Sequence, residues 1–316
     1  MIGSSASAKT VCFEKDIGFF CCETGQALSE DIETFSRFKY GDVEAVRSLS
    51  KITASFFISL LENRGEFLAI FERAAADDSF VYLQSPGIRN VASASYHLME
   101  AVASYVNPWL AINGFPTMIK KPITRLASGI PNYAQLSYSE RKNRAKSTVS
   151  LLPSSDYVEY PIHVVFVDDV EVTGATKMRA QRSALEAGAL SFSSIFCFKV
   201  ESALAERNSS IENVLNQFTV KGNLDSEVAS ILKNIEYQPV QKMLRLLLNS
   251  SNRRNLETFV KKHISDSNLL RIYLAALSND YHSITSNSEF LYLDSLNILK
   301  SILVEKKIIN RSGLLM

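Results

Sequence analysis

Two adjacent carboxylates and a glycine turn make residues 168–176 the part of the sequence best suited to chemistry. Asp168 and Asp169 follow the mostly apolar run 163–167, and a Thr-Gly-x-Thr turn closes the segment. Backbone N–H groups in a tight turn at a helix start hold phosphate well, because the helix dipole favours an anion there. Carboxylates can accept hydrogen bonds from sugar hydroxyls, and Mg²⁺ prefers carboxylates together with substrate phosphates. A phosphorylated sugar with Mg²⁺ therefore fits this segment better than the alternative, an Asp-rich cap on an ordinary helix.

In this order the residues resemble the signature of type I phosphoribosyltransferases, which use 5-phosphoribosyl-1-pyrophosphate (PRPP). The resemblance implies that Asp168 and Asp169 take the ribose hydroxyls and Mg²⁺. It also implies a PRPP-binding loop made of Val170, Glu171, Val172, Thr173, Gly174, Ala175 and Thr176. Purine-using members usually carry an aspartate where this chain has Val172, which argues against a 6-oxopurine acceptor. Glu171 is also unusual, and we expect its side chain to point away from the phosphate.

The elements that must position this loop alternate between strand and helix. Apolar runs and helical periodicity predict a strand at 80–84, a helix at 90–106, a strand at 163–167, a helix at 176–187 and a strand at 193–200. Asn107-Pro108 is expected to stop the first of these helices, because proline cannot continue the hydrogen-bond ladder. The pattern predicts an α/β fold with a mostly parallel central sheet flanked by helices. The loop then lies at the carboxyl end of a strand, where open sheets of this kind bind ligands.

Two further segments are candidates for the diphosphate end of PRPP. In the family, one loop after an early strand binds pyrophosphate, and a flexible hood supplies cations. The turn that matches the first is Ser85, Pro86, Gly87 and Arg89, and a plain turn is the alternative. The hood corresponds to about residues 115–148, with Lys121, Arg125 and Arg141 as candidate catalytic cations. A solvated amphipathic helix beginning at Ser137 is the alternative for the end of that segment.

A second resemblance covers about residues 30–300. The segment 38–42, the turn at 84–86, the basic hood and the helical tail are similar to a ComF-like phosphoribosyltransferase branch found in bacterial tellurite-resistance-type stress operons. From about Ser202 the chain carries helical periodicity and almost no strand signals, which predicts an all-α C-terminal extension. We therefore expect an α/β domain at 1–200 and a helical region at 201–316.

Composition limits the partners that the chain can have. With 34 basic and 33 acidic residues the net charge is +1, so no global field would attract nucleic acid or an anionic membrane. The apolar stretches are too short to span a membrane and the N-terminus lacks a secretion signal, so we expect a cytoplasmic protein. Neither the four cysteines nor the four histidines have the spacing of a zinc site or a catalytic triad.

Three functions remain open at this stage. The first is Mg²⁺-dependent transfer of phosphoribosyl to an unidentified nucleobase or nucleotide-like acceptor, with pyrophosphate release. The second is a regulator that senses PRPP without transfer. The third is an effector of an anti-phage system, such as a retron, controlled by a protein partner docked on the helical C-terminal region. Nucleic acid is expected to be contacted only through a complex, and a homodimer is a further alternative.

Overall fold

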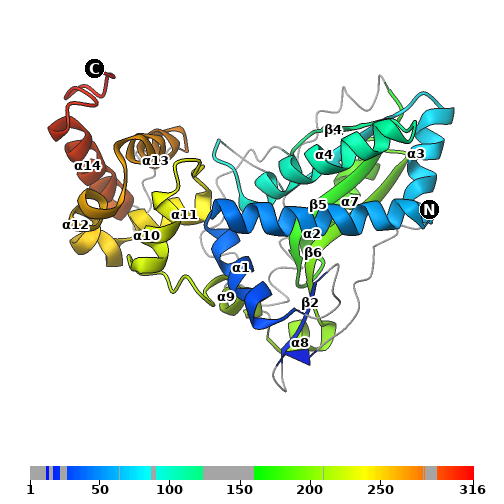
Figure 1. Ribbon diagram of the computed structural model, residues 1–316, viewed down its shortest axis with the longest axis horizontal. Coiled ribbons are helices and arrows are strands. Elements are labelled where there is room, and N and C mark those ends of the chain that lie inside the picture. Colours follow the sequence, from blue (N-terminus) through cyan, green and yellow to red (C-terminus); the bar gives the residue numbers. More distant parts are fainter. Residues whose placement is uncertain are drawn as a thin grey trace. The chain divides into compact units, whose positions relative to one another are not determined.

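The computed structural model describes residues 12–13, 17–21, 27–63, 65–86, 90–123, 160–208, 210–279, 281 and 290–316. The chain divides into two compact units. The first contains Met1–Thr34, Val46–Arg89 and Ser95–Leu215. The second contains Phe35–Ala45, Asn90–Ala94 and Asn216–Met316. Figure 1 labels helices and strands of both units.

A six-stranded sheet, in the order β1-β2-β6-β5-β3-β4, forms the centre of the first unit. Its parallel part consists of β6 (Ser191–Val200), β5 (Ile162–Glu171), β3 (Phe80–Gln84) and β4 (Met118–Lys120). β2 (Ile17–Cys21) pairs antiparallel with β6, and β1 (Cys12–Phe13) pairs antiparallel with β2. This is the α/β fold with a mostly parallel sheet that the sequence predicted.

The connections between the parallel strands leave the centre of the sheet in opposite directions. β3 leads through α4 (Ala94–Ile112) to β4 on one side, whereas β5 leads through α7 (Ala175–Glu186) to β6 on the other side. β3 and β5 are neighbours, so the topological switch point of the sheet lies between them. Ligands of open α/β sheets bind outside the carboxyl ends of the strands at such a point.

The core of this unit explains why β5 occupies the centre of the sheet. All ten of its residues are buried, as expected for a strand covered on both faces. Val164 and Phe166 pack on one face with Ala180 and Ala184 of α7. Helices α2 (Val43–Glu62) and α3 (Glu66–Ala76) complete the helical part before β3. α8 (Ser202–Arg207) and most of α9 (Ile211–Asn216) also belong to this unit.

Two elements differ from the sequence prediction. The expected stop at Asn107-Pro108 is wrong, because α4 continues through Pro108 to Ile112. Proline removes the hydrogen bond to the carbonyl of Ser104, but Ser104 is exposed and water can replace that bond. Leu110 is fully buried, so packing favours a further turn of helix. β5 is also longer than the predicted strand, and its pairing with β6 extends to Glu171 opposite Lys199.

The second unit is helical apart from an isolated bridge between Ile309 and Leu315 in its described part. Its C-terminal helices are α10 (Ser226–Lys233), α11 (Gln241–Leu248), α12 (Arg253–His263), α13 (Asp266–Ser278) and α14 (Phe290–Glu305), drawn from yellow to red in Figure 1. α14 contacts α11, α12 and α13, and the largest side chain that is fully buried is Tyr237. The predicted all-α C-terminal extension is confirmed.

A segment from the N-terminal part of the chain is built into this helical unit. α1 (Ser29–Lys39) ends there, and Ser36, which is fully buried, donates to the carbonyl of Asn216 at 2.9 Å. The backbone N–H groups of Thr219 and Val220 donate to the same hydroxyl, at 3.0 and 3.2 Å. Tyr40 packs in the core of the C-terminal helices. The unit therefore needs residues that lie about 180 positions apart in the sequence.

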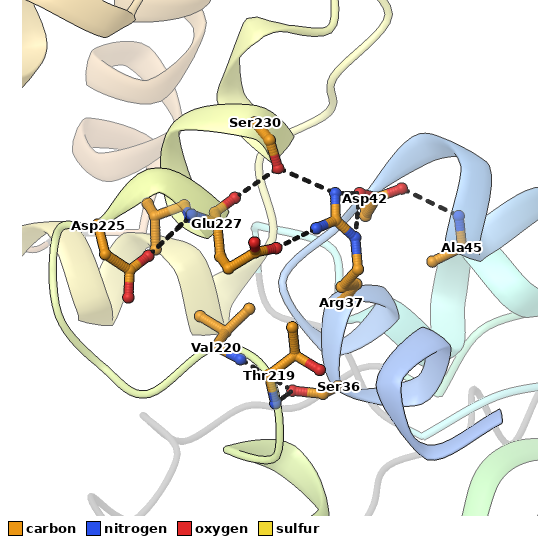
Figure 2. Close-up of polar contacts among 10 residues, drawn as sticks. Ser36, Arg37, Asp42, Ala45, Thr219, Val220, Asp225, Glu227 and Ser230 are labelled. Carbon is orange, nitrogen blue, oxygen red and sulfur yellow. Dashed lines mark hydrogen bonds and ion pairs between the residues drawn. The ribbon is translucent and has the colours of Figure 1, made fainter. Parts of the chain in front are cut away.

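Arg37 adds charged contacts to the same join, as Figure 2 shows. Its guanidinium donates to Asp42 at 2.6 and 3.0 Å, to Ser230 at 3.0 Å, and to Glu227. Asp42 in turn accepts from the backbone N–H of Ala45 at 3.0 Å and so caps the start of α2. Each acid thus has a defined partner, and Arg37 links the end of α1 to α10.

A third segment of the helical unit, Asn90–Ala94, precedes α4 directly. The side chain of Gln241 donates to the carbonyl of Val91, and its backbone N–H donates to the carbonyl of Ala92, both at 3.1 Å. Asn90 donates to the carbonyl of Ser278. This short segment is therefore fixed by one backbone and two side-chain hydrogen bonds to α11 and α13.

None of the helices in the described ranges is both long enough and apolar enough to cross a lipid bilayer.

Candidate functional site

The turns that follow β3 and β5 meet at the switch point of the sheet. Gln84 pairs with Phe166, so the next residues, Ser85 and Pro86, run beside the part of β5 that leads to Asp168. Ser85 and Pro86 are both buried. Among the described residues the hydroxyl of Ser85 has no hydrogen-bond partner. A fully buried hydroxyl without a partner is costly unless a ligand or water satisfies it.

The acidic pair lies inside β5 and converges on one hydroxyl. Asp168 and Asp169 are 6% and 3% exposed, and Ser95 of α4 is 5% exposed. Ser95 Oγ lies 2.8 Å from Oδ1 of Asp168 and 3.0 Å from Oδ2 of Asp169. The backbone N–H of Asp169 also donates to Oδ1 of Asp168, at 2.8 Å. The two carboxylates are therefore turned toward the same point, although side chains of successive strand residues usually point to opposite faces.

The oxygen atoms of this pair fit a magnesium ion that binds together with a phosphorylated substrate. Two buried carboxylates with converging oxygens are the hard donors that Mg²⁺ prefers, completed by water and substrate phosphates. No group of three or more His, Cys, Asp or Glu side chains suited to a metal lies within the described residues. Within the described ranges, Asp168 and Asp169 thus form a partial site that water and substrate phosphates would complete.

The turn after the acidic pair opens α7 in a form suited to an anion. Gly174 is the N-cap of α7 and has φ +69°, the left-handed conformation that glycine adopts without strain. Gly174 has no side chain to cap the helix, and Thr173 Oγ1 accepts a long hydrogen bond of 3.4 Å from the N–H of Ala175. The first N–H groups of a helix lack partners within the helix and form the positive end of its dipole, so the start of α7 can donate hydrogen bonds to an anion. Thr173 and Thr176 are both partly exposed beside this turn.

Glu171 lies close to this turn, and two lysines contact its carboxylate. Its carboxylate forms ion pairs with Lys177 in the first turn of α7 and with Lys199 of β6, the second at 3.8 Å. The residue is 8% exposed. Its Oε1 would lie 3.3 Å from a Cβ added at Gly174, so the carboxylate reaches close under the turn. The site thus contains a Lys-Glu-Lys cluster whose net charge is positive.

We expect Glu171→Gln to strengthen binding of inorganic phosphate by the full-length protein. The change keeps the size of the side chain, but it removes a negative charge close to the helix start. At the effective dielectric of a partly buried site the gain is about 1 kcal/mol, or roughly fivefold in affinity. Calorimetric titration with phosphate measures it, and Glu186→Gln at the exposed end of α7 is the control. Weaker binding by Glu171→Gln would show instead that the carboxylate maintains the turn.

Lys121 lies at the same edge of the sheet, directly after β4. Its backbone N–H donates to the carbonyl of Leu83 at 2.9 Å, which continues the pairing of β4 with β3. Its Nζ lies 5.8 Å from the ring centroid of Tyr82, a cation–π contact with β3. The other predicted residues of the diphosphate end, Gly87, Arg89, Arg125 and Arg141, lie outside the described residues, and so does most of the hood.

His97 and His163, the histidines of the first unit, are placed for packing and not for proton transfer at the carboxyl end of the parallel strands. Burial lowers the pKa of His163, and its Nδ1 lies 2.8 Å from Ser191 Oγ at the opposite, amino end of β5. Burial also lowers the pKa of His97, which packs edge-on against Tyr96. His97 is two residues beyond Ser95 on α4, and helix residues at this spacing do not share a face.

Ser95, Lys177 and Lys199 are site residues that the sequence prediction did not include. The predicted helix start at residue 90 put Ser95 inside a helix, whereas α4 begins at Ala94 and carries Ser95 at its first turn. Lys199 is paired across the sheet with Glu171, a register that only the folded strands define. Lys177 had a local signal, since it stands near Glu171 at the start of the predicted helix.

Comparison with known proteins identifies one family. Residues 23–293 match the PRTase ComF-like family. The match includes β3, β5, α7 and most of the helical unit. No curated protein and no solved structure shows significant similarity to the chain.

Proposed function

Because the chain belongs to the ComF-like phosphoribosyltransferase family, we propose that it binds PRPP at the carboxyl ends of β3 and β5. We further propose that it transfers the phosphoribosyl group to an acceptor and releases pyrophosphate. The observation that supports this most is the acidic pair beside the glycine turn that opens α7, at the switch point of the sheet. PRPP carries a phosphate and a diphosphate on the same ribose. Its site therefore needs an anion-binding turn and an acidic pair that lie about one ribose apart.

In the proposed complex the 5′-phosphate accepts hydrogen bonds from the backbone N–H groups at the start of α7. Gly174 allows the phosphate to approach the backbone closely, and Thr173 and Thr176 donate their hydroxyls. Lys177 and Lys199 offset part of the charge of Glu171, so the carboxylate repels the phosphate less than an unpaired carboxylate would. The ribose hydroxyls donate to Asp168 and Asp169.

The diphosphate of PRPP is proposed to extend toward the ends of β3 and β4. There the buried Ser85 hydroxyl can donate a hydrogen bond, and Lys121 provides positive charge. Bound Mg²⁺ would supply further positive charge that favours departure of the pyrophosphate. Asp168 and Asp169 are the residues that would hold it.

The proposed acceptor is a nucleobase or a nucleotide-like molecule other than a 6-oxopurine. Val172 is partly exposed in the phosphate turn and carries no group that can move a proton. Purine-using members of the wider family usually have an aspartate there, so this chain lacks that base. Its acceptor must either be deprotonated by another group or be nucleophilic without a base.

Calorimetric titration of the full-length protein with PRPP, with and without Mg²⁺, tests the donor site. We expect saturable binding that is stronger with Mg²⁺, and weaker binding of ribose 5-phosphate because it lacks the diphosphate. Incubation with a panel of bases, nucleosides and nucleotides should then release pyrophosphate with at least one member, and hypoxanthine and guanine should be inactive. Absence of PRPP binding would overturn the proposal. PRPP binding without release for any acceptor would favour a sensing role.

A further inference from the structure

Ser95 lies where it can control the orientation of both aspartates. It is the second residue of α4, and it comes 73 and 74 positions before the two carboxylates that its hydroxyl meets. All three residues are buried, at 5%, 6% and 3% exposed. The contact is therefore shielded from water. Hydrogen bonds to charged groups are stronger in such a buried environment than in water.

This contact differs from ordinary capping by a serine at a helix start. A capping serine accepts a hydrogen bond from a backbone N–H of its own helix. Ser95 instead directs its oxygen to carboxylates of another element, at 2.8 and 3.0 Å. The hydroxyl has only one hydrogen, so it can donate to only one carboxylate at a time. Its position between the two oxygens keeps both of them turned toward one point.

We propose that Ser95 is a positioning residue that presents Asp168 and Asp169 together to PRPP and its Mg²⁺. The inference rests on the proposed function, since it assigns a role within the same site. Without the hydroxyl, less of the repulsion between the two carboxylates is compensated, and their oxygens are held less firmly toward one point. The pair then binds Mg²⁺ less well, although the phosphate turn at α7 stays intact.

Calorimetric titration of PRPP over a range of Mg²⁺ concentrations tests this role in the full-length protein. Ser95→Ala and Ser95→Cys both remove the strong donor, and the thiol keeps nearly the size of the hydroxyl. We expect each to weaken PRPP binding about tenfold, as for loss of one hydrogen bond to a charged group. The Mg²⁺ concentration that gives half of the maximal affinity should rise by a similar factor. Ser95→Thr retains the hydroxyl and should restore both quantities to within about twofold.

The control is Ser104→Ala on the same helix. Ser104 is exposed, and its hydroxyl bonds only within α4, to the carbonyl of Ala101. Circular dichroism and thermal melting of each variant report whether the fold is retained. A purely structural role would lower PRPP affinity equally at every Mg²⁺ concentration, and this result would overturn the inference.

Two other outcomes separate this inference from the proposed function. If the unaltered protein binds PRPP and the Ala and Cys variants bind it equally well, Ser95 has no positioning role and the proposed function still stands. If the unaltered protein binds no PRPP at any Mg²⁺ concentration, the proposed function fails and the inference fails with it.

Discussion

Replacing both aspartates by asparagine, Asp168→Asn with Asp169→Asn, should abolish PRPP binding without unfolding the protein. Each change removes a charged acceptor for a ribose hydroxyl and a ligand for Mg²⁺. Hydrogen bonds to charged groups contribute about 1.5–3 kcal/mol each, so we expect at least a hundredfold loss of affinity. The fold should persist, because asparagine has the same shape and removing two adjacent buried charges of like sign costs little. Calorimetry with PRPP and Mg²⁺, together with a thermal melt, measures both effects.

A second pair of adjacent aspartates provides the matched control for this variant. Asp77 and Asp78 are exposed after α3, in the same unit of the chain. Asp78 has φ +50°, a conformation that asparagine tolerates as well as aspartate. Asp77→Asn with Asp78→Asn should therefore bind PRPP like the unaltered protein. If the variant at 168 and 169 also bound PRPP within about threefold of normal, the acidic pair would have no part in the site.

Gly41→Ala is expected to destabilise the helical unit strongly. Gly41 has φ +82°, and a Cβ there would lie 3.2 Å from Gln238 O, Tyr237 Cε2 and Val240 Cγ1. The left-handed conformation costs a non-glycine residue about 1–2 kcal/mol, and overpacking a core costs about 1–3 kcal/mol more. The sum is about 2–5 kcal/mol, or a fall in melting temperature of roughly 10 °C. Thermal unfolding followed by circular dichroism at 222 nm checks this result.

Gly222→Ala separates the two contributions to that loss. Gly222 belongs to the same unit and has φ +89°, but an added Cβ would meet nothing within 4 Å. This control should therefore show the conformational cost alone, about 1–2 kcal/mol. Hydrogen exchange should also rise in α10 and α11 for Gly41→Ala and not for Gly222→Ala. Equal melting temperatures for the two variants would show that Gly41 is not tightly packed.

The elements around the site were predictable where a local pattern was sufficient. β3 begins and ends as predicted, because an apolar run of strand length is bounded by a turn containing proline and glycine. α7 begins within one residue of its predicted start, since Gly174 marks the turn before it. The glycine turn before α7 and the acidic pair were identifiable as candidate site residues from residue types and spacing, because both lie in one continuous segment of the chain.

Features that depend on distant contacts were not predictable in this way. The apolar run predicted that β5 ends at Val167, yet the strand continues through Asp168, Asp169 and Glu171. Ser95 and Lys199 contact these carboxylates inside the fold, and both lie far from them in the sequence. Similarly, burial of Leu110 outweighs the local tendency of Pro108 to end α4. In each case tertiary packing decided against the local propensity.

The interleaving of the two units has a consequence for any shortened form of this protein. The chain passes between the units at five points, and two short stretches of the helical unit, Phe35–Ala45 and Asn90–Ala94, are encoded upstream of β5. A premature stop after Leu215 would leave both stretches without the helices that cover them. One of the two ends immediately before Ser95. Loss of residues 216–316 would thus remove the contacts that fix Asn90–Ala94, directly before the serine whose hydroxyl contacts the acidic pair. For this reason residues 216–316 cannot be exchanged between relatives as an independent module.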